Sequence, residues 1–150
     1  MTTENSKPGD EARIRALIDS RVKAVRAKDV DGVMSRNAAH IVTFDLPPPL
    51  QSTGSNALYR NDLEDWFASF NGPVGYEIRD LRITTGDEVA FCHSLNRISG
   101  TRTDGEETDV WTRATVCLCK IEGKWMVTHE HVSVPFYMDG SDRAALDLEP

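Results

Sequence analysis

The feature that most constrains the fold is a hairpin signal in the last third of the chain, over residues 107–136. Two runs rich in valine, tryptophan, threonine and cysteine flank the dipeptide Glu122-Gly123. A turn dipeptide between two β-prone runs is typical of two antiparallel strands joined by a tight turn. We therefore expect a β-hairpin here, around which the rest of the chain is organised.

The second strand of this hairpin carries a pair of histidines. His129 and His131 are two residues apart, and side chains two apart along a strand point to the same face of a sheet. The same alternation, extended back toward the turn, includes Trp125 and Val127. We therefore expect both histidines to share one sheet face with Trp125 and Val127.

An amphipathic helix is expected at the start of the folded part, over residues 10–27. Asp10 is of a residue type that caps helix N-termini. Apolar residues recur at three- and four-residue spacing, which places them on one stripe: Ile14, Leu17, Ile18, Val22 and Val25. The basic side chains are expected to form mostly the solvent face: Arg13, Arg15, Arg21, Lys23, Arg26 and Lys28.

Two further helices are expected before most of the strands. Asp29 or Asp31 can cap a short second helix, and a third helix is expected over residues 55–69. The segment at residues 71–73, Asn-Gly-Pro, is expected to end the third helix. The apolar positions of this helix have the spacing of a core-facing side: Leu58, Leu63, Trp66, Phe67 and Phe70.

Three more strands are expected, at residues 40–46, 74–85 and 89–99. The first ends at consecutive prolines, which have no backbone N–H and cannot continue a strand ladder. The alternation of the second slips near Asp80, which indicates a β-bulge. Residues 100–106 are polar and are expected to form a loop before the hairpin.

This order of elements predicts the fold class. Helices followed by a run of antiparallel strands are typical of α+β domains. We expect one domain over residues 10–136, between a disordered tail at 1–9 and an acidic tail at 137–150 that forms a short helix or none. In this domain a curved, mixed or antiparallel sheet wraps on about three N-terminal helices, makes a cone and encloses a pocket.

Composition excludes several classes of partner. The net charge of −7 and the lack of a basic run argue against nucleic acid and against an anionic membrane surface. No apolar run approaches the roughly 20 residues of a spanning helix, and residues 1–10 do not resemble a signal peptide, so we expect a cytoplasmic protein. The cysteines are odd in number and strand-like in setting, which favours reduced thiols: Cys92, Cys117 and Cys119.

Several short motifs carry a family resemblance. They are AKDVD at 27–31, FDLPP at 44–48 with Gly54, WTRAT at 111–115, GKW at 123–125 and HEHVSVPF at 129–136. These residues resemble the nuclear-transport-factor-2-like (NTF2-like) superfamily, and more narrowly its SnoaL-like group, often labelled ketosteroid isomerase homologues. The resemblance spans roughly residues 11–136 and implies the cone fold, whose members include isomerases, cyclases, dehydratases and non-catalytic binding modules.

The resemblance also implies a homodimer, because members of this superfamily commonly pair through the outer face of the sheet. On the last strand, the residues expected to point outward and to serve this contact are Met126, Thr128, Val132 and Val134.

Asp45 is the leading candidate for a catalytic residue. By resemblance, ketosteroid isomerases place their proton-shuttling aspartate in this region of the fold, also before a proline. A carboxylate partly removed from water has a raised pKa and can move protons at carbon next to a carbonyl. The alternative is a structural aspartate that caps the following loop. His129 and His131 are candidates for the partner acid or base, because imidazoles exchange protons near neutral pH.

Donors for a developing oxyanion are expected from the hairpin. Trp111 and Arg113 share a face in a regular strand and offer an indole N–H and a guanidinium fork. The alternatives are core packing for Trp111 and an ion pair for Arg113. His93 is a further candidate for a substrate contact, as is Trp66, for which core packing is the alternative. The first helix lacks the tyrosine that ketosteroid isomerases use, so their oxyanion hole is not reproduced.

Three functions from different classes remain open. The first is a small-molecule-binding protein that isomerises, cyclises or dehydrates a small apolar or carbonyl-containing compound by proton transfer, without a cofactor. The second is a non-catalytic ligand-binding or dimerisation module. The third is a metal-dependent enzyme in which His93, His129 and His131, with Asp45, hold a divalent ion.

Overall fold

The structure is a computed structural model that describes residues 9–55 and 57–150. The helices are α1 (Asp10–Arg26), α2 (Val30–Met34) and α3 (Ala57–Ala68). The strands are β1 (Asn37–Phe44), β2 (Ser52–Thr53), β3 (Phe70–Thr85), β4 (Val89–Arg102), β5 (Glu107–Ile121) and β6 (Lys124–Ser133). They form one sheet in the order β2-β1-β6-β5-β4-β3, in which only β1 and β6 pair in parallel. The α+β class and the mixed, curved sheet are therefore confirmed.

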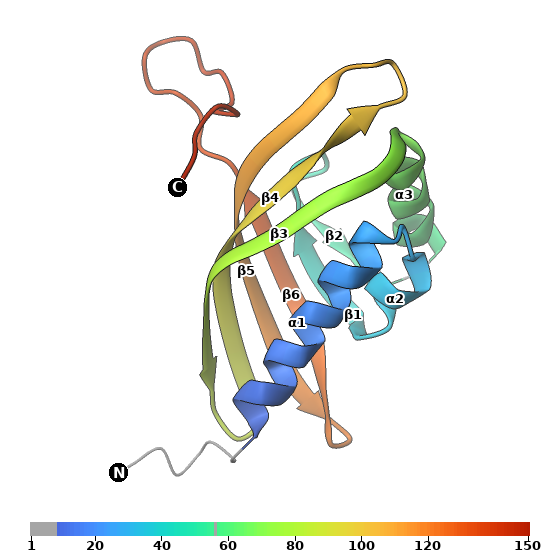
Figure 1. Cartoon of the computed structure of the whole chain (residues 1–150). Helices are drawn as coiled ribbons and strands as arrows, with labels where there is room; N and C mark the ends of the chain where they lie inside the picture. Colours follow the sequence, from blue (N-terminus) through green and yellow to red (C-terminus); the bar gives the residue numbers. More distant parts are fainter. Residues whose placement is uncertain (1–8, 56) are drawn as a thin grey trace.

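The main core lies between α1 and the sheet. Figure 1 shows α1 lying along one side of the strongly bent sheet, with α2 and α3 beside its end. The apolar stripe of α1 contributes Ile14, Leu17 and Ile18 to this core, as its spacing predicts. The strands contribute Ile41, Ala90, Cys92, Val116, Leu118, Trp125 and Val127. We call the side of the sheet that packs on α1 the inner face.

A second core lies at the other end of α1. It joins Ala24 and Val25 of α1 to residues of α2, α3 and the start of β3: Val33, Phe67, Phe70 and Val74. Trp66 packs against this cluster, with its ring edge-on to Phe70. Between the two cores, Asp29 caps α2 because its side chain accepts a hydrogen bond from the Gly32 N–H.

Several element boundaries differ from the sequence-based expectation. β1 begins and ends earlier than residues 40–46, so Asp45 lies just beyond the strand. β3 begins at Phe70, although residues 71–73 were expected to be a stop. The register of β3 shifts between Asn71 and Gly75, and this irregularity accommodates the proline, which cannot donate to the ladder. β4 extends to Arg102, which shortens the expected loop at 100–106. The bulge near Asp80 is confirmed by a second register shift.

The expected roles of two charged residues of α1 are wrong. Asp10 does not cap the helix, because it is its first residue and its side chain is turned inward, where it accepts from the indole Nε1–H of Trp125 (3.2 Å). The N-cap is Gly9, in a left-handed conformation that suits glycine. Arg21 does not lie on the solvent face but on the inner side, where it pairs with Glu130.

A β-bulge in β6 reverses the expected face of both histidines. Val127 pairs with Leu118, but His129 pairs with the very next residue of β5, Cys117, so Thr128 is an extra residue. The bulge shifts the alternation by one position. As a result, Trp125 and Val127 point inward, whereas His129 and His131 point to the outer face, and Glu130 between them points inward.

The same bulge corrects the expected outer face of β6. Val132 pairs with Ala114, which is buried on the inner face, so Val132 does not point outward. Met126 pairs with Cys119 on the outer face, as expected. Thr128, in the bulge, donates from Oγ1 to the Cys117 carbonyl oxygen (3.3 Å).

The C-terminal segment forms no helix. A β-bridge joins Phe136 to Ala144, and Ala145 donates from its backbone N–H to the Pro135 carbonyl oxygen (2.8 Å). Ala145 is buried, which fixes this part of the segment to the end of the domain. Among the described residues there is no helix of the length and apolar character required to cross a membrane.

Candidate functional site

A hollow of about 570 Å³ lies where β1 and β6 end, beneath the proline loop. Its volume is within the range of small-molecule sites. Two of the predicted catalytic residues, Asp45 and His131, line it together. The rest of the lining is largely apolar and comes from the proline loop and the end of β6: Phe44, Leu46, Pro47, Pro48, Pro49, Leu50, Val132, Ser133 and Val134. We call this region the Asp45 hollow.

Asp45 has the electrostatics of a proton-transfer group. One side of the residue is exposed to the hollow, but the surrounding protein removes enough water to raise the pKa of its carboxyl group. The negative charge of Glu130 acts in the same direction. A hydrogen bond from the Leu46 N–H (2.7 Å) opposes both effects but does not overcome them. Asp45 is therefore a stronger base than an ordinary aspartate.

The Glu130 that acts on this carboxylate belongs to an ion pair on the inner face. Arg21 of α1 donates from Nη2 to Oε1 of Glu130 on β6 (3.1 Å), and their side chains are only 11% and 16% exposed. Sequence reasoning missed both residues. The signal for Arg21 was its spacing, since it lies three, four and seven residues after Ile18, Leu17 and Ile14 on the apolar stripe.

A chain of hydrogen bonds continues across the inner face. Asn96 of β4 donates from Nδ2 to the hydroxyl oxygen of Tyr76 on β3 (3.0 Å), and Ser94 donates to Oδ1 of Asn96 (2.6 Å). Burial, with the charge of Glu130, raises the pKa of Tyr76 to about 12. Tyr76 therefore stays protonated at neutral pH and is a hydrogen-bond donor on the inner face.

Tyr59 of α3 and Asn37 of β1 add to the same polar region. Burial and the negative charge of Glu130 raise the pKa of the Tyr59 hydroxyl. The nearby Asn37 amide lowers this pKa by a smaller amount. Even so, neither amide atom of Asn37 meets hydrogen-bond geometry with a described residue. Because buried polar atoms are normally paired, Asn37 marks a place where water or a ligand group can bind.

The candidates on β4, β5 and β6 lie on the outer face of the sheet, where His131 lines the Asp45 hollow and the others do not. In the register of the sheet, His93 pairs with Thr115 and Thr115 pairs with His131, while Arg113 pairs with Ser133. These positions alternate with the buried inner residues of β4 and β5. The expected convergence of Trp111, Arg113, His93, His129 and His131 on the inner pocket is therefore wrong. The Thr128 bulge turns the two β6 histidines outward, and the register of β4 and β5 places the other three on the outer face.

One of these outer residues lines the Asp45 hollow, and a second contacts it through another side chain. His131 lines it directly, and Arg113 donates from Nε to Oγ of Ser133, which also lines it (3.2 Å). His129 is held away from the hollow: its Nδ1–H donates to the Val42 carbonyl oxygen (2.7 Å), and its ring contacts Phe44.

Trp111 and Trp66 do not line the hollow. The Arg97 guanidinium lies 5.9 Å from the centre of the Trp111 ring on the outer face. Trp66 belongs to the second core.

The predicted metal alternative is not assembled. Over residues 9–55 and 57–150, no three histidine, cysteine, aspartate or glutamate side chains come close enough together to hold a metal ion. The cysteines offer no activated nucleophile either, because burial raises the pKa of Cys92 to about 11 and that of Cys117 also rises.

Comparison with known proteins identifies the family. The model of the SnoaL-like domain matches residues 14–137. The chain belongs to the SnoaL-like family, within the NTF2-like superfamily. A solved NTF2-like protein of unknown function from Pseudomonas putida shares 34% identity, with a TM-score of 0.86 and coverage of 96% of this chain and 99% of that one. No curated protein matches the sequence at a significant level.

More distant solved structures share the fold. A proposed scytalone dehydratase from Novosphingobium aromaticivorans is 12% identical, with a TM-score of 0.75 over 93% of this chain and 95% of that one. A proposed ketosteroid isomerase from Shewanella frigidimarina is 20% identical, with a TM-score of 0.69 over 84% and 98%. At these identities the likeness shows a common cone and no common reaction.

Proposed function

We propose that this SnoaL-like protein binds a small carbonyl-containing organic molecule in the Asp45 hollow and catalyses a cofactor-independent proton transfer on it. The observation that carries the proposal is the position of Asp45, a carboxylate with a raised pKa, in a largely apolar hollow that also contains an imidazole. Isomerisation and dehydration both begin with removal of a proton from carbon next to a carbonyl. The dehydratase and isomerase names of the distant relatives agree with this class.

Four side chains divide the chemistry. The Asp45 carboxylate takes the proton, and negative charge develops on the carbonyl oxygen. The hydroxyl of Ser133 donates a hydrogen bond to the carbonyl oxygen of the substrate. Ser133 Oγ in turn accepts from the Arg113 guanidinium, which strengthens the hydroxyl as a donor. His131 delivers a proton to the new carbon position in an isomerisation, or to the departing hydroxyl group in a dehydration. The proton count balances, since Asp45 and His131 exchange protons with water between turnovers.

The test is a proton-exchange assay that does not require the natural substrate. Deuterium exchange at the carbons beside the carbonyl of 2-tetralone, an enolisable bicyclic ketone, is followed by NMR in D₂O with wild-type protein. Wild-type protein should accelerate exchange over buffer. Asp45→Asn should lower the rate at least about 100-fold. The matched control, Asp87→Asn, changes an exposed turn aspartate and should leave the rate unchanged. Equal rates for Asp45→Asn and wild type would remove Asp45 from the mechanism.

We also propose that two copies pair through the outer face of the sheet. On this face Val89 is 60% exposed and Phe91 46% exposed, which is unusual for large apolar side chains. Sedimentation equilibrium should give a dimer for the wild type. Phe91→Glu, which places a charge in the contact, should give a monomer with an unchanged circular dichroism spectrum. A monomeric wild type would contradict the pairing.

A further inference from the structure

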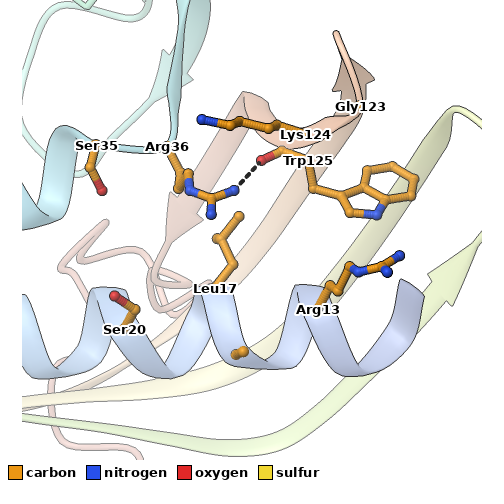
Figure 2. Close-up of a pocket in the computed structure, with 9 residues that line it drawn as sticks. Arg13, Leu17, Ser20, Ser35, Arg36, Gly123, Lys124 and Trp125 are labelled. Atoms are coloured by element: carbon orange, nitrogen blue, oxygen red, sulfur yellow. Dashed lines mark hydrogen bonds between the residues drawn. The ribbon is translucent and has the colours of Figure 1, made fainter. Parts of the chain in front are cut away.

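A second hollow, of about 330 Å³, shares no lining residue with the Asp45 hollow. Figure 2 shows it between the first half of α1, the turn before β1 and the start of β6. Three of its lining side chains are basic: Arg13, Arg36 and Lys124. The lining, all of it within the described part of the chain, contains no carboxylate. This concentration of positive charge contrasts with a net charge of −7 for the whole chain.

The nearest bonded carboxylate does not neutralise the hollow. Asp10 accepts from Arg13 (3.2 Å) and from Lys120 (3.2 and 3.3 Å), so one negative charge is shared between two cations. Arg36 and Lys124 have no ion-pair partner among the described residues. Their charges are therefore available to an anion from solution.

Arg36 is held in place before any ligand arrives. Its Nη1 donates to the Trp125 carbonyl oxygen (3.3 Å), the contact drawn as a dashed line in Figure 2. Its own carbonyl oxygen accepts from the Val127 N–H (2.8 Å). A guanidinium has five N–H donors, so most remain for a ligand. A side chain that is already fixed loses less conformational entropy on binding.

The base of the hollow is apolar. Leu17 and Trp125 both line it and are 6% and 3% exposed. In Figure 2 the Leu17 side chain points from α1 toward Arg36. Hydroxyl groups of Ser20 and Ser35 complete the rim. The site thus combines several separated positive charges with a small apolar surface.

We propose that this hollow binds the phosphate group of a small phosphorylated molecule, with the apolar part of that molecule against Leu17 and Trp125. A phosphate monoester carries close to two negative charges and three acceptor oxygens at neutral pH, which suits several separate cations better than a carboxylate does. The proposal is independent of the proton-transfer function, because it involves neither Asp45 nor the hollow around it.

The experiment is isothermal titration calorimetry of the full chain with phenyl phosphate. Inorganic phosphate, benzoate and benzyl alcohol are the comparison probes. We expect one phenyl phosphate per chain, bound more tightly than any comparison probe and more weakly as salt is added. Absence of binding at millimolar phenyl phosphate would overturn the proposal. Binding of benzoate at equal affinity would overturn the choice of phosphate, and equal binding of benzyl alcohol would overturn the role of charge.

Matched variants test whether phenyl phosphate binds in this hollow. Arg36→Gln should weaken phenyl phosphate binding about 10- to 100-fold, because a charge-assisted hydrogen bond is lost. Arg15→Gln makes the same charge change at an exposed position of α1 and should alter the affinity less than about 2-fold. Lys124→Gln, with Lys23→Gln as its control, tests the site again without touching the Arg36 contacts to β6. Equal losses in a variant and its control would show only a general charge effect and would contradict the site.

Discussion

Asp10 and Asp45 are two aspartates in opposite environments. Asp10 is fully covered by the side chains around it, and hydrogen bonds from Trp125 and Lys120 outweigh the effect of burial and lower its pKa. Asp45 is partly open to a hollow, accepts one hydrogen bond from the described residues, that of the Leu46 N–H, and has a raised pKa. A carboxylate whose lone pairs are satisfied by protein donors stabilises the fold. A carboxylate that lacks them is available to a ligand.

Glu130 contributes to the raised pKa of Asp45 and also forms the buried ion pair with Arg21, so changing it should have the largest effect. Glu130→Gln leaves the Arg21 guanidinium, 11% exposed, without its ion pair and should lower the free energy of unfolding by about 3 kcal/mol. The pKa of Asp45 should fall toward its usual value, because a charge that raises it is removed. Chemical denaturation measures the first effect, and an NMR titration of the Asp45 carboxyl measures the second.

The control for this prediction is Glu64→Gln, an exposed residue of α3, which should change stability by less than about 0.5 kcal/mol. An unchanged Asp45 pKa in Glu130→Gln would separate the buried ion pair from the proposed site. Equal stability of the two variants would show that the ion pair does not hold β6 to α1.

The sequence predicted which segments form helices and strands better than it predicted the side on which each side chain lies. Periodicity is a local property, so the helix at 10–27, the hairpin turn at Glu122-Gly123 and the bulge near Asp80 could all be predicted. Arg21 was misassigned because its charge was given more weight than its position on the apolar stripe. Positional spacing was the better guide, since a partner 109 residues away neutralises the charge.

The bulge at Thr128 explains most of the error in the site. Nothing in the local composition distinguishes Thr128 from an ordinary strand residue, since threonine is common in strands. The extra residue is defined only by the pairing of β6 with β5, which is a relation between two strands and not a local property of β6. One added residue moves Glu130 inward and both neighbouring histidines outward. Asp45 lies beside the proline loop, as its sequence position requires, but its role as the catalytic residue stays a prediction.

The second prediction concerns the structural aspartate. Asp10→Asn should lower the free energy of unfolding by about 2 kcal/mol at pH 7, because Lys120, 11% exposed, loses its counter-charge. A lowered folded pKa means that this stabilisation is fully present above the usual value of 3.8 and is lost as pH falls through the folded pKa. Thermal melts at pH 7 and near pH 3 should show the difference from wild type shrinking.

The matched control is Asp19→Asn, an exposed aspartate on the same helix, which should leave the melting temperature nearly unchanged at both pH values. If the Asp10→Asn difference persisted in full well below pH 3, it would arise from lost packing and not from the charge of Asp10.

The smallest change in stability is expected for Asp45→Asn, and it should be an increase where the other two substitutions give a decrease. Because the folded pKa of Asp45 is raised, the fold favours the protonated form, so stability falls as pH rises from 3.8 through the folded pKa. Asp45→Asn removes the charge and should therefore melt slightly higher than wild type at pH 7. The rise should be no more than about 2 °C, because water screens this partly exposed group.

Below pH 3.8 the advantage of Asp45→Asn should disappear, since the wild-type carboxyl is then protonated in both the folded and the unfolded chain. Asp87→Asn serves as the control and should show no rise at either pH. A lower melting temperature for Asp45→Asn at pH 7 would mean that Asp45 is structural, like Asp10. A higher one, together with loss of exchange activity, would mean that the chain keeps a destabilising charge at this position because the reaction requires it.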